Sequence, residues 1–300
     1  MKDSSRELRG MTVALVGVAI FAGTLPATRL AVAEFDAWWV ALARAELAAV
    51  LAAGALWITG QRLPARADWP ALALVALGVV LGFPLFTSLA MRSSPASHAA
   101  VVVGLLPFAT AIAATMRTGE RPAPLFWVAA AAGSTIVAAF ALRDDGGPLR
   151  AGDWALLAAV ASAALGYAEG GRLARTLGGW QTIAWALVLA APVLLLPTVV
   201  LTMAQPLAAA SARAWAAFTY VSVFSQLLGF LFWYGGMAIG GVARVSQVQL
   251  LQIFFTLIIA WLLLDEPVDA VTWLVAAGVV GSIALGRKAP VRRPAGSARD

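Results

Sequence analysis

The chain has no cysteine, one histidine and few charges, and each scarcity excludes a class of chemistry. Without cysteine there is no disulfide, no thiolate metal site and no cysteine nucleophile. Only 12% of the 300 residues are charged, whereas about 25% are charged in a soluble domain. Hydrophobic residues make up 61% of the chain, against about 45–50% in a soluble domain. The apolar segments offer neither a metal-ligand cluster nor paired carboxylates at helical spacing, so we expect no catalytic residue, metal or cofactor.

Apolar runs recur along the whole chain at a length near the ~20 residues that a membrane-spanning helix needs. The N-terminal MKDSSRELRG leads into the first run without a small-residue cleavage site, so we expect no removable signal peptide. The connections are short, which leaves no room for a soluble domain. The ten predicted spans are 11–33, 37–58, 69–91, 95–116, 124–142, 153–172, 180–201, 214–238, 243–264 and 267–286.

Basic residues gather on one predicted side of the membrane. With the N-terminus in the cytoplasm, 15 of the 21 Lys and Arg residues fall on the cytoplasmic side, 5 on the other, and Arg44 lies inside a span. This positive-inside bias predicts both termini in the cytoplasm. The net charge of +6 is then explained by topology and by anionic lipid, and we expect membrane lipids, not nucleic acid, as the partner of the basic tail.

The two halves of the chain share one pattern at an offset of 146 residues. Three tryptophan pairs coincide without a gap, whereas random pairing of 12 tryptophans in 300 residues would give fewer than one. The matched pairs are Trp39 with Trp185, Trp69 with Trp215, and Trp127 with Trp273. The offset places spans one to five on spans six to ten, which predicts two repeats over 1–147 and 148–300.

Because each repeat holds five spans, the second must lie upside down in the membrane relative to the first. The predicted fold is therefore an all-α integral membrane protein with ten transmembrane helices, arranged as two inverted five-helix repeats around a central cavity. Inverted repeats give a transporter two related gates on opposite sides of a midplane site, and so alternating access. The alternative is a duplication kept only for folding or dimerisation.

Glutamines inside predicted spans eight and nine need polar partners that lipid does not offer. At helical spacing, Gln249 and Gln252 share one narrow face of span nine. A matching face of span eight carries Gln226, Phe230 and Trp233. We predict that these five side chains line the cavity. The alternative for the span-nine amides is a dry contact between helices, which is the interpretation we prefer for Gln247, off the polar face.

Further candidates lie in spans three, four and six. Phe83 and Phe86 flank a proline in span three, Tyr167 lies in a glycine-rich part of span six, and His98 near the start of span four is the only histidine. We include these four in the predicted substrate site. His98 would act as a proton relay, or as an ordinary hydrogen-bonded residue near a helix end.

Two charged residues within spans have structural alternatives. Glu169 in span six is predicted to form a surface ion pair with Arg172, or to be a cavity carboxylate. For Arg44 in span two we prefer a structural role, because its side chain can snorkel outward or bind a cluster of carbonyls. Energy coupling is expected to be facilitated diffusion, or weak proton coupling through His98 or Glu169.

Three motifs resemble the EamA type of the drug/metabolite transporter superfamily: ARAELAAVLAA at 43–53, SSPASHAAVVVGLLPFATAIAATMRTGER at 93–121, and GGVARVSQVQLLQIFFTLIIAWLLLDEP at 240–267. The chain looks most like the YddG-type amino-acid exporters of bacterial inner membranes. That resemblance implies spans one, three, four, six, eight and nine around the cavity, and export of aromatic and other neutral amino acids. The second copy has Ile253 where the first has Pro107, so the two gates need not bend alike.

The predicted lining of amides, hydroxyls and rings suits a neutral or zwitterionic solute with an apolar side chain. A phosphorylated solute would need buried clusters of Lys or Arg, and no phosphate-binding Gly-Lys-Ser/Thr loop is present to couple ATP. Alternatives are an exporter of cationic aromatic drugs or another small metabolite, a membrane-embedded enzyme, and a non-transporting accessory protein. The oligomeric state is expected to be a monomer or a homodimer.

Overall fold

The computed structural model describes residues 2–118, 121–141, 150–287 and 291–292, apart from the side chains of some residues that include Ser246 and Gln247. The first half contains α1 (Lys2–Ala22), α2 (Thr24–Val32), α3 (Ala37–Ile58), η1 (Arg66–Asp68), α4 (Trp69–Val75), η2 (Ala76–Gly82), α5 (Phe83–Ala90), α6 (Ala96–Val103), α7 (Leu106–Thr118), β1 (Arg121–Pro122) and α8 (Pro124–Ala141).

The second half contains α9 (Ala151–Leu177), α10 (Gly179–Met203), η3 (Leu207–Ala209), α11 (Ala212–Thr219), η4 (Tyr220–Leu228), α12 (Gly229–Gly240), α13 (Val242–Val245), η5 (Ser246–Leu250), α14 (Leu251–Leu264), α15 (Ala270–Arg287) and β2 (Val291–Arg292). The strands β1 and β2 are two residues each and pair antiparallel. The rest of the described secondary structure is helical, as the sequence predicts.

Seven helical segments of the described chain are long and apolar enough to cross a membrane. Predicted spans five, nine and ten contain shorter apolar helices, so the count of ten remains a prediction. The seven segments are Arg6–Val32, Ala37–Ile58, Arg66–Ala90, Ala96–Arg117, Ala151–Leu177, Gly179–Met203 and Ala212–Gly240.

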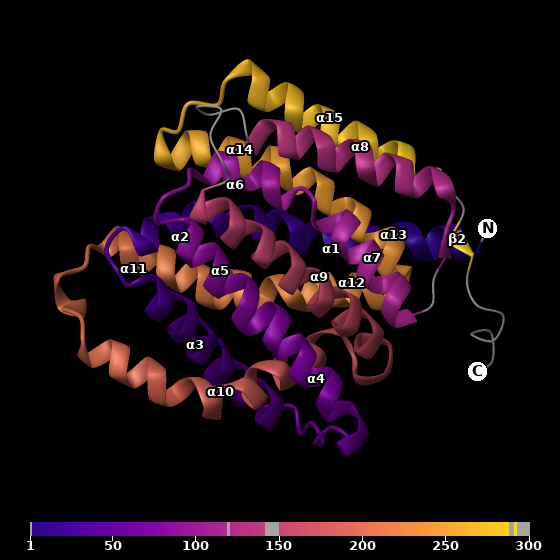
Figure 1. Cartoon of the computed structure of the whole chain (residues 1–300). Coiled ribbons are helices and arrows are strands. Elements are labelled where there is room, and N and C mark those ends of the chain that lie inside the picture. Colours follow the sequence, from indigo (N-terminus) through magenta and orange to yellow (C-terminus); the bar gives the residue numbers. More distant parts are fainter. Residues whose placement is uncertain (1, 119–120, 142–149, 288–290, 293–300) are drawn as a thin grey trace.

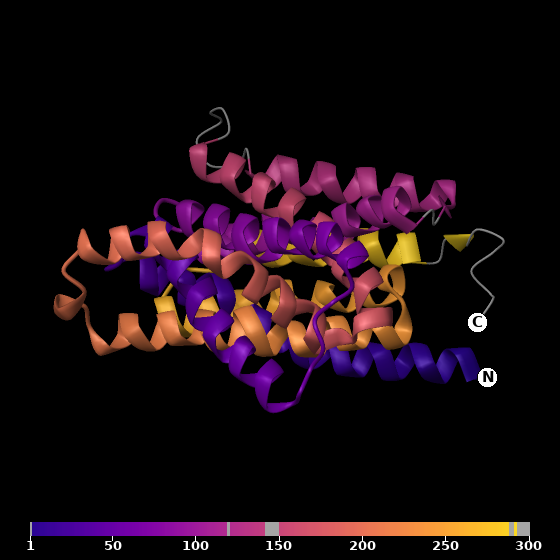
Figure 2. The ribbon, with the colours of Figure 1, turned by 90° about the horizontal axis from the view of Figure 1, so that it is seen from below.

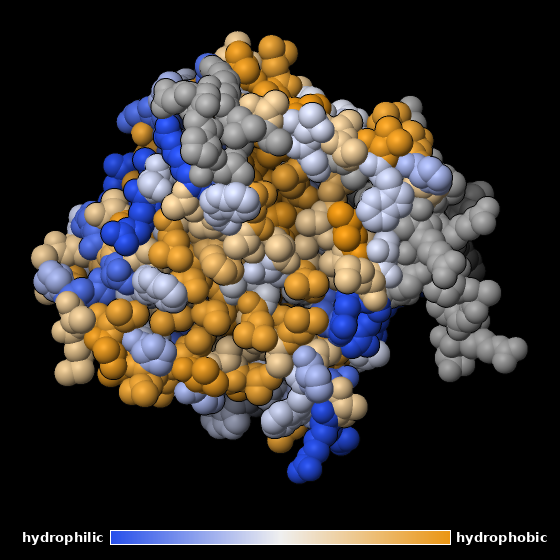
Figure 3. Space-filling model, in the orientation of Figure 1, coloured by the Kyte–Doolittle hydropathy of each residue, from blue (hydrophilic) through white to orange (hydrophobic). Residues whose placement is uncertain are grey.

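Large apolar side chains cover the sides of the bundle. Trp57, Val193, Leu196, Met203 and Leu274 are among those exposed by 70% or more. Figure 3 shows apolar residues over most of the face in view, with hydrophilic residues gathered toward its left and right edges. A surface of this kind is stable in lipid and unfavourable in water.

The helices run side by side in one bundle (Figures 1 and 2). At its periphery α3 packs along α10 and α8 packs along α15, while α1 packs along α12 through the middle. Helix α1 begins at the end of the bundle where β2 lies, and the connection from α14 to α15 lies at the opposite end (Figure 1). We call these the terminal end and the far end.

Several helices are irregular halfway along their length, and most of the irregularities recur in both halves. The π-helices η2 and η4 begin at residues 76 and 220, close to the 146-residue offset. The chain is interrupted between α6 and α7 at 104–105, and at η5, residues 246–250. Ile253 therefore does not abolish the second interruption. Cδ1 of Ile253 packs against Gly104 so closely that a side chain at position 104 would collide with it.

A network at the far end joins the two halves of the chain. Glu266 accepts hydrogen bonds from the backbone N–H groups of Ala96 (2.9 Å) and Ser97 (2.8 Å), the first residues of α6. Its Oε1 also lies 3.2 Å from Nε of Arg29, which donates to the carbonyls of Met91 and Ser94. The carboxylate thus caps a helix start, where backbone donors and the helix dipole favour negative charge.

Replacing Glu266 by Ala is expected to lower the stability of the folded protein. The change removes two hydrogen bonds to a charged acceptor and leaves two buried N–H groups unpaired, which is worth about 1.5–3 kcal/mol. The measurement is the melting temperature in detergent. Asp68→Ala is the control, because Asp68 precedes α4 without a side-chain cap bond. Equal melting temperatures for the two variants would contradict the cap.

A second far-end contact gives a pH dependence. Ser211 donates to Glu34 from its hydroxyl and from its backbone N–H, both at 2.6 Å. These two hydrogen bonds hold the pKa of Glu34 below its ordinary value. Because the folded-state pKa is lowered, the stabilisation is present above the unfolded-state pKa and is lost as the pH falls through the folded-state pKa.

We therefore expect the connection around Ser211 to loosen on acidification below about pH 4, near the ordinary pKa of a glutamate. The measurement is backbone hydrogen exchange at 210–214 as a function of pH. In Glu34→Gln this exchange should already be faster at neutral pH and should lose its acid dependence. An unchanged acid dependence in that variant would exclude Glu34 as the cause.

Candidate functional site

A small buried cavity lies where the irregular helices meet. Its volume is about 10 Å³, which is room for about one water molecule, so an amino-acid-sized solute requires the helices around it to separate. Both halves contribute to its wall. The lining residues are Phe21, Thr24, Arg44, Val79, Phe83, Tyr167, Ser225, Gln226, Phe230 and Gln252.

Gln226 compensates for a proline in the opposite helix. Pro84 has no N–H, so the carbonyls of Val79 and Val80, five and four residues earlier, lack a helical donor. The amide nitrogen of Gln226 donates to both, at 3.1 and 3.4 Å. Its Oε1 is buried and has no hydrogen-bond partner among the described residues. One side of this amide thus supports the fold, and the other is available to a ligand.

Gln252 and Thr256 support the interrupted first span in the same way. Pro26 leaves the carbonyl of Ala22 without its helical donor, and the hydroxyl of Thr256 donates to that carbonyl at 3.0 Å. Gln252 donates to the carbonyl of Phe21 over 3.5 Å. This contact is at the long limit for a hydrogen bond, so Gln252 is held loosely and also faces the cavity.

Gln249 lies beside the central cavity. It lines a second space of about 10 Å³ together with Gln252 and Thr256. Its amide nitrogen donates to Oε1 of Gln252 at 3.3 Å. Its Oε1 has no hydrogen-bond partner within the part of the chain that the structure describes. The structure thus places Gln252 in the lining of the central cavity and Gln249 in the adjoining space, where it is hydrogen-bonded to Gln252.

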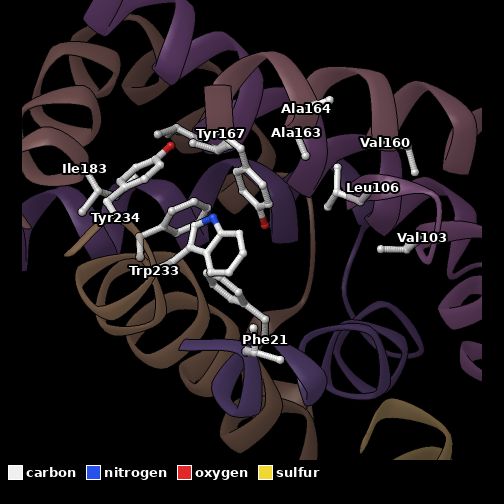
Figure 4. Close-up of a cluster of buried hydrophobic side chains, with 14 of the residues drawn as sticks. Phe21, Val103, Leu106, Val160, Ala163, Ala164, Tyr167, Ile183, Trp233 and Tyr234 are labelled. Atoms are coloured by element: carbon white, nitrogen blue, oxygen red, sulfur yellow. The ribbon is translucent and has the colours of Figure 1, made fainter. Parts of the chain in front are cut away.

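Aromatic rings from α1, α9 and α12 form one cluster against the cavity (Figure 4). Ring centroids lie 5.0 Å apart for Phe21 and Phe230, 5.9 Å for Tyr167 and Phe230, and 5.3 Å for Tyr167 and Trp233. Most pairs are tilted or edge-to-face, as aromatic pairs prefer. Nε1 of Trp233 is buried and finds no hydrogen-bond partner in the described part of the chain, so the cluster has an unused donor there.

Arg44 is a cavity residue, although the sequence favours a structural role for it. Its side chain is 1% exposed and lines the central cavity. Nη2 donates to the hydroxyl of Ser225 at 3.1 Å, and that hydroxyl is 2.8 Å from the hydroxyl of Thr24. An arginine inside a long apolar span, two residues from Glu46, is the one signal in the sequence that could have indicated that Arg44 lines the cavity. Phe21, Thr24 and Ser225 carry no such signal.

The remaining predicted site residues lie in different places. Phe83 lines the cavity, whereas Phe86, one turn further along α5, does not. His98 is also outside the cavity, and its Nε2 is 2.7 Å from Oδ1 of Asp153. The ring of His98 stacks on Phe140. His98 is thus a hydrogen-bonded residue near a helix start, which is the second of the two interpretations given for it. Because neither Phe86 nor His98 lines the cavity, we leave both out of the proposed site.

Glu169 forms an ion-paired group away from the cavity. Its carboxylate is fully buried and accepts from Nε of Arg117 at 2.8 Å and from Nη2 of Arg172 at 2.6 Å. The expected pair with Arg172 is present, but the carboxylate is not on the surface and does not line the cavity. The group links α7 to α9 near the C-terminal ends of both helices. The side chain of Gln247 lies outside the described residues.

The sequence profile of the EamA-like transporter family matches the chain twice, over residues 8–142 and 150–286. The chain belongs to this family. It is therefore a multi-pass membrane transporter and not an enzyme, and its family domain is duplicated. Both expectations from the sequence, the EamA resemblance and the absence of an enzymatic role, are confirmed.

Two relatives and one solved structure are similar over nearly the whole chain. The "Uncharacterized transporter YdeK" of Bacillus subtilis (strain 168) is 46% identical over 284 residues, 95% of this chain and 99% of the relative. The "Probable terminal-alkyne amino-acid exporter" of Streptantibioticus cattleyicolor is 25% identical over 283 residues, 92% and 93% of the two chains. A crystal structure matches with a TM-score of 0.69 at 16% identity, over 93% of this chain and 98% of its own. That likeness concerns the fold alone.

Proposed function

We propose that this EamA transporter exports amino acids, with aromatic and other neutral ones favoured, together with related aromatic compounds. The observation that carries the proposal is one buried cavity in which an unpaired amide oxygen lies against an aromatic cluster. Oε1 of Gln226 has no hydrogen-bond partner among the described residues and can accept from an ammonium group, and Gln249 lines the adjoining space. The rings of Tyr167 and Phe230 offer an apolar surface to the solute's side chain.

The proposed mechanism is alternating access between two inverted five-helix repeats, 1–147 and 148–300. Supporting it are the duplicated family domain, the irregular stretches that recur near the offset, and a cavity built by both halves. The Glu266–Arg29 contact closes the far end and the Glu169–Arg117 contact ties helices together near the other. With both in place and about 10 Å³ of space, we assign this conformation to a closed state between the two open ones.

The orientation is proposed from the charge bias: the terminal end faces the cytoplasm of a bacterial inner membrane. The chain has no cysteine, so one introduced thiol reports on its own position. Arg62→Cys and Ala208→Cys place thiols at exposed positions in connections on opposite predicted sides. In intact cells an impermeant thiol reagent should label position 208 and spare position 62. The reverse pattern would overturn the proposed orientation.

Counterflow in liposomes tests the function. Purified protein is reconstituted into liposomes loaded with unlabelled phenylalanine, and entry of labelled phenylalanine is followed with and without a pH gradient. Saturable entry above that of empty liposomes is expected. Competition by other neutral amino acids should be stronger than competition by lipophilic aromatic cations. If no saturable entry of phenylalanine is seen, an accessory role is favoured. If counterflow is seen only when the liposomes are loaded with a cationic aromatic drug, a drug exporter is favoured.

A further inference from the structure

We infer that Arg44 binds a carboxylate of the transported solute, so that the cavity takes zwitterions and organic anions and rejects free amines. The inference deepens the proposed function, since it concerns the same cavity, and it names the charge that a substrate must carry. It also decides between amino acids and cationic aromatic drugs, which the amides and rings of the cavity would both accommodate.

The guanidinium of Arg44 has most of its hydrogen-bonding capacity free. Nη2 donates once, to Ser225. Nε and Nη1 have no hydrogen-bond partner among the residues that the structure describes, and together they carry three of the five N–H donors of the group. The planar fork of a guanidinium fits a carboxylate with two parallel hydrogen bonds. A side chain placed only to stabilise the bundle would be expected to use these donors on backbone carbonyls.

No counter-ion for Arg44 is present among the described residues. The ion pairs that involve Arg29, His98, Arg117 and Arg172 do not include Arg44. Glu46 is two positions along the same helix and therefore points to another face. A buried charge without a partner is unfavourable, most of all within a membrane, and such residues mark substrate pathways. We conclude that the solute supplies the anion.

The groups opposite Arg44 complete a site for a zwitterion. Gln226 and Gln252 line the same cavity, and Oε1 of Gln226 is unpaired, so an ammonium group has an acceptor there. The rings of Phe230 and Tyr167 also line this space. The three parts together match the carboxylate, ammonium and side chain of an aromatic amino acid. A lipophilic cation would meet Arg44 as a like charge at short range.

Three probes that share one ring separate the charges. Phenylalanine carries both, 3-phenylpropionate carries only the carboxylate, and phenethylamine carries only the ammonium. Each is added as a competitor of phenylalanine counterflow in liposomes, and each is also tested for its effect on the melting temperature of the protein in detergent. A ligand that binds the folded protein raises this temperature, which gives a readout that does not require transport.

In the unaltered protein, phenylalanine and 3-phenylpropionate should bind more tightly than phenethylamine. Arg44→Gln should weaken both carboxylates by about 30-fold or more and reverse their ranking against phenethylamine. Arg44→Lys should keep the ranking with weaker binding, because an ammonium cannot form the two-pronged contact. Ser225→Ala is the matched control: it removes the protein's own bond to Arg44 and should also keep the ranking.

The outcomes distinguish this inference from the proposed function. One outcome is that the carboxylate probes raise the melting temperature only when Arg44 is present and that no counterflow is seen. This outcome would support the inference and overturn amino-acid transport. If the ranking of the three probes is unchanged in Arg44→Gln, or if this variant weakens the binding of all three equally, the inference is overturned while amino-acid transport stands. If Arg44→Gln does not fold, the unaltered protein and Arg44→Lys decide. Preference of the unaltered protein for phenethylamine over 3-phenylpropionate would refute the role of Arg44.

Discussion

Replacing Gln252 by Leu is expected to reduce phenylalanine flux by about 10- to 150-fold while the protein still folds. This factor corresponds to the loss of one hydrogen bond to a charged ligand group, about 1.5–3 kcal/mol. The cost to the fold should be small, because the bond from Gln252 to the carbonyl of Phe21 is long, 3.5 Å. Leucine is also favourable in a membrane helix.

The measurement pairs counterflow with the melting temperature. Gln181→Leu is the matched control, because Gln181 lies at the start of α10 and pairs with Gln61, away from the cavity. Its flux should be unchanged. If Gln252→Leu transports normally and melts early, the amide serves only to join helices. The alternative interpretation of the span-nine glutamines would then be correct.

Gly236→Ala is expected to destabilise the bundle, whereas Gly235→Ala should not. The helices α1 and α12 approach so closely that a Cβ on Gly236 would lie 2.6 Å from the carbonyl oxygen of Gly10. That atom is backbone and can move only with its helix. On Gly235 the nearest atom is a methyl group of Val13 at 3.9 Å, which is an ordinary contact. Overpacking of this kind costs about 1–3 kcal/mol.

The comparison is sharp because the two positions are adjacent in one helix. Alanine raises helix propensity at both, so a propensity effect would move both melting temperatures in the same direction. Gly236 and Gly240 form the small-xxx-small pattern that lets membrane helices meet backbone to backbone. We expect a lower melting temperature and less folded protein for Gly236→Ala alone. Equal values for both variants would show that α1 can shift to relieve the contact.

Much of the helical architecture is predictable from the sequence because lipid leaves few choices. A backbone in a membrane must satisfy its hydrogen bonds within a helix, so long apolar runs predict helices, and seven of the ten predicted spans coincide with helical segments long enough to cross a membrane. The match of Trp69 with Trp215 indicates the duplication from the amino-acid sequence alone. The helical phase of Gln226 and Gln252 likewise predicts one cavity, because few amides can face lipid.

The details that depend on broken helices are not predictable in the same way. Pro84 and Pro26 mark where backbone pairing fails, but the sequence does not say which side chain repairs it. That pairing joins residues more than 140 positions apart, as for Gln226 and Val80. The sequence favours a structural role for Arg44 and does not predict its place in the cavity lining, for a similar reason. Whether a charge in a span points outward or into a cavity depends on helix rotation, which packing determines and hydrophobicity alone does not.

Access to the cavity from both sides of the membrane tests the central claim most directly. Thr24 lines the cavity and is 2% exposed, and Thr24→Cys introduces the only thiol of the chain. Under alternating access, a small impermeant thiol reagent should label this position both in intact cells and in inverted vesicles. Phenylalanine should slow both reactions. Labelling from one side only, or labelling that phenylalanine does not affect, would contradict a substrate cavity that opens alternately to each side.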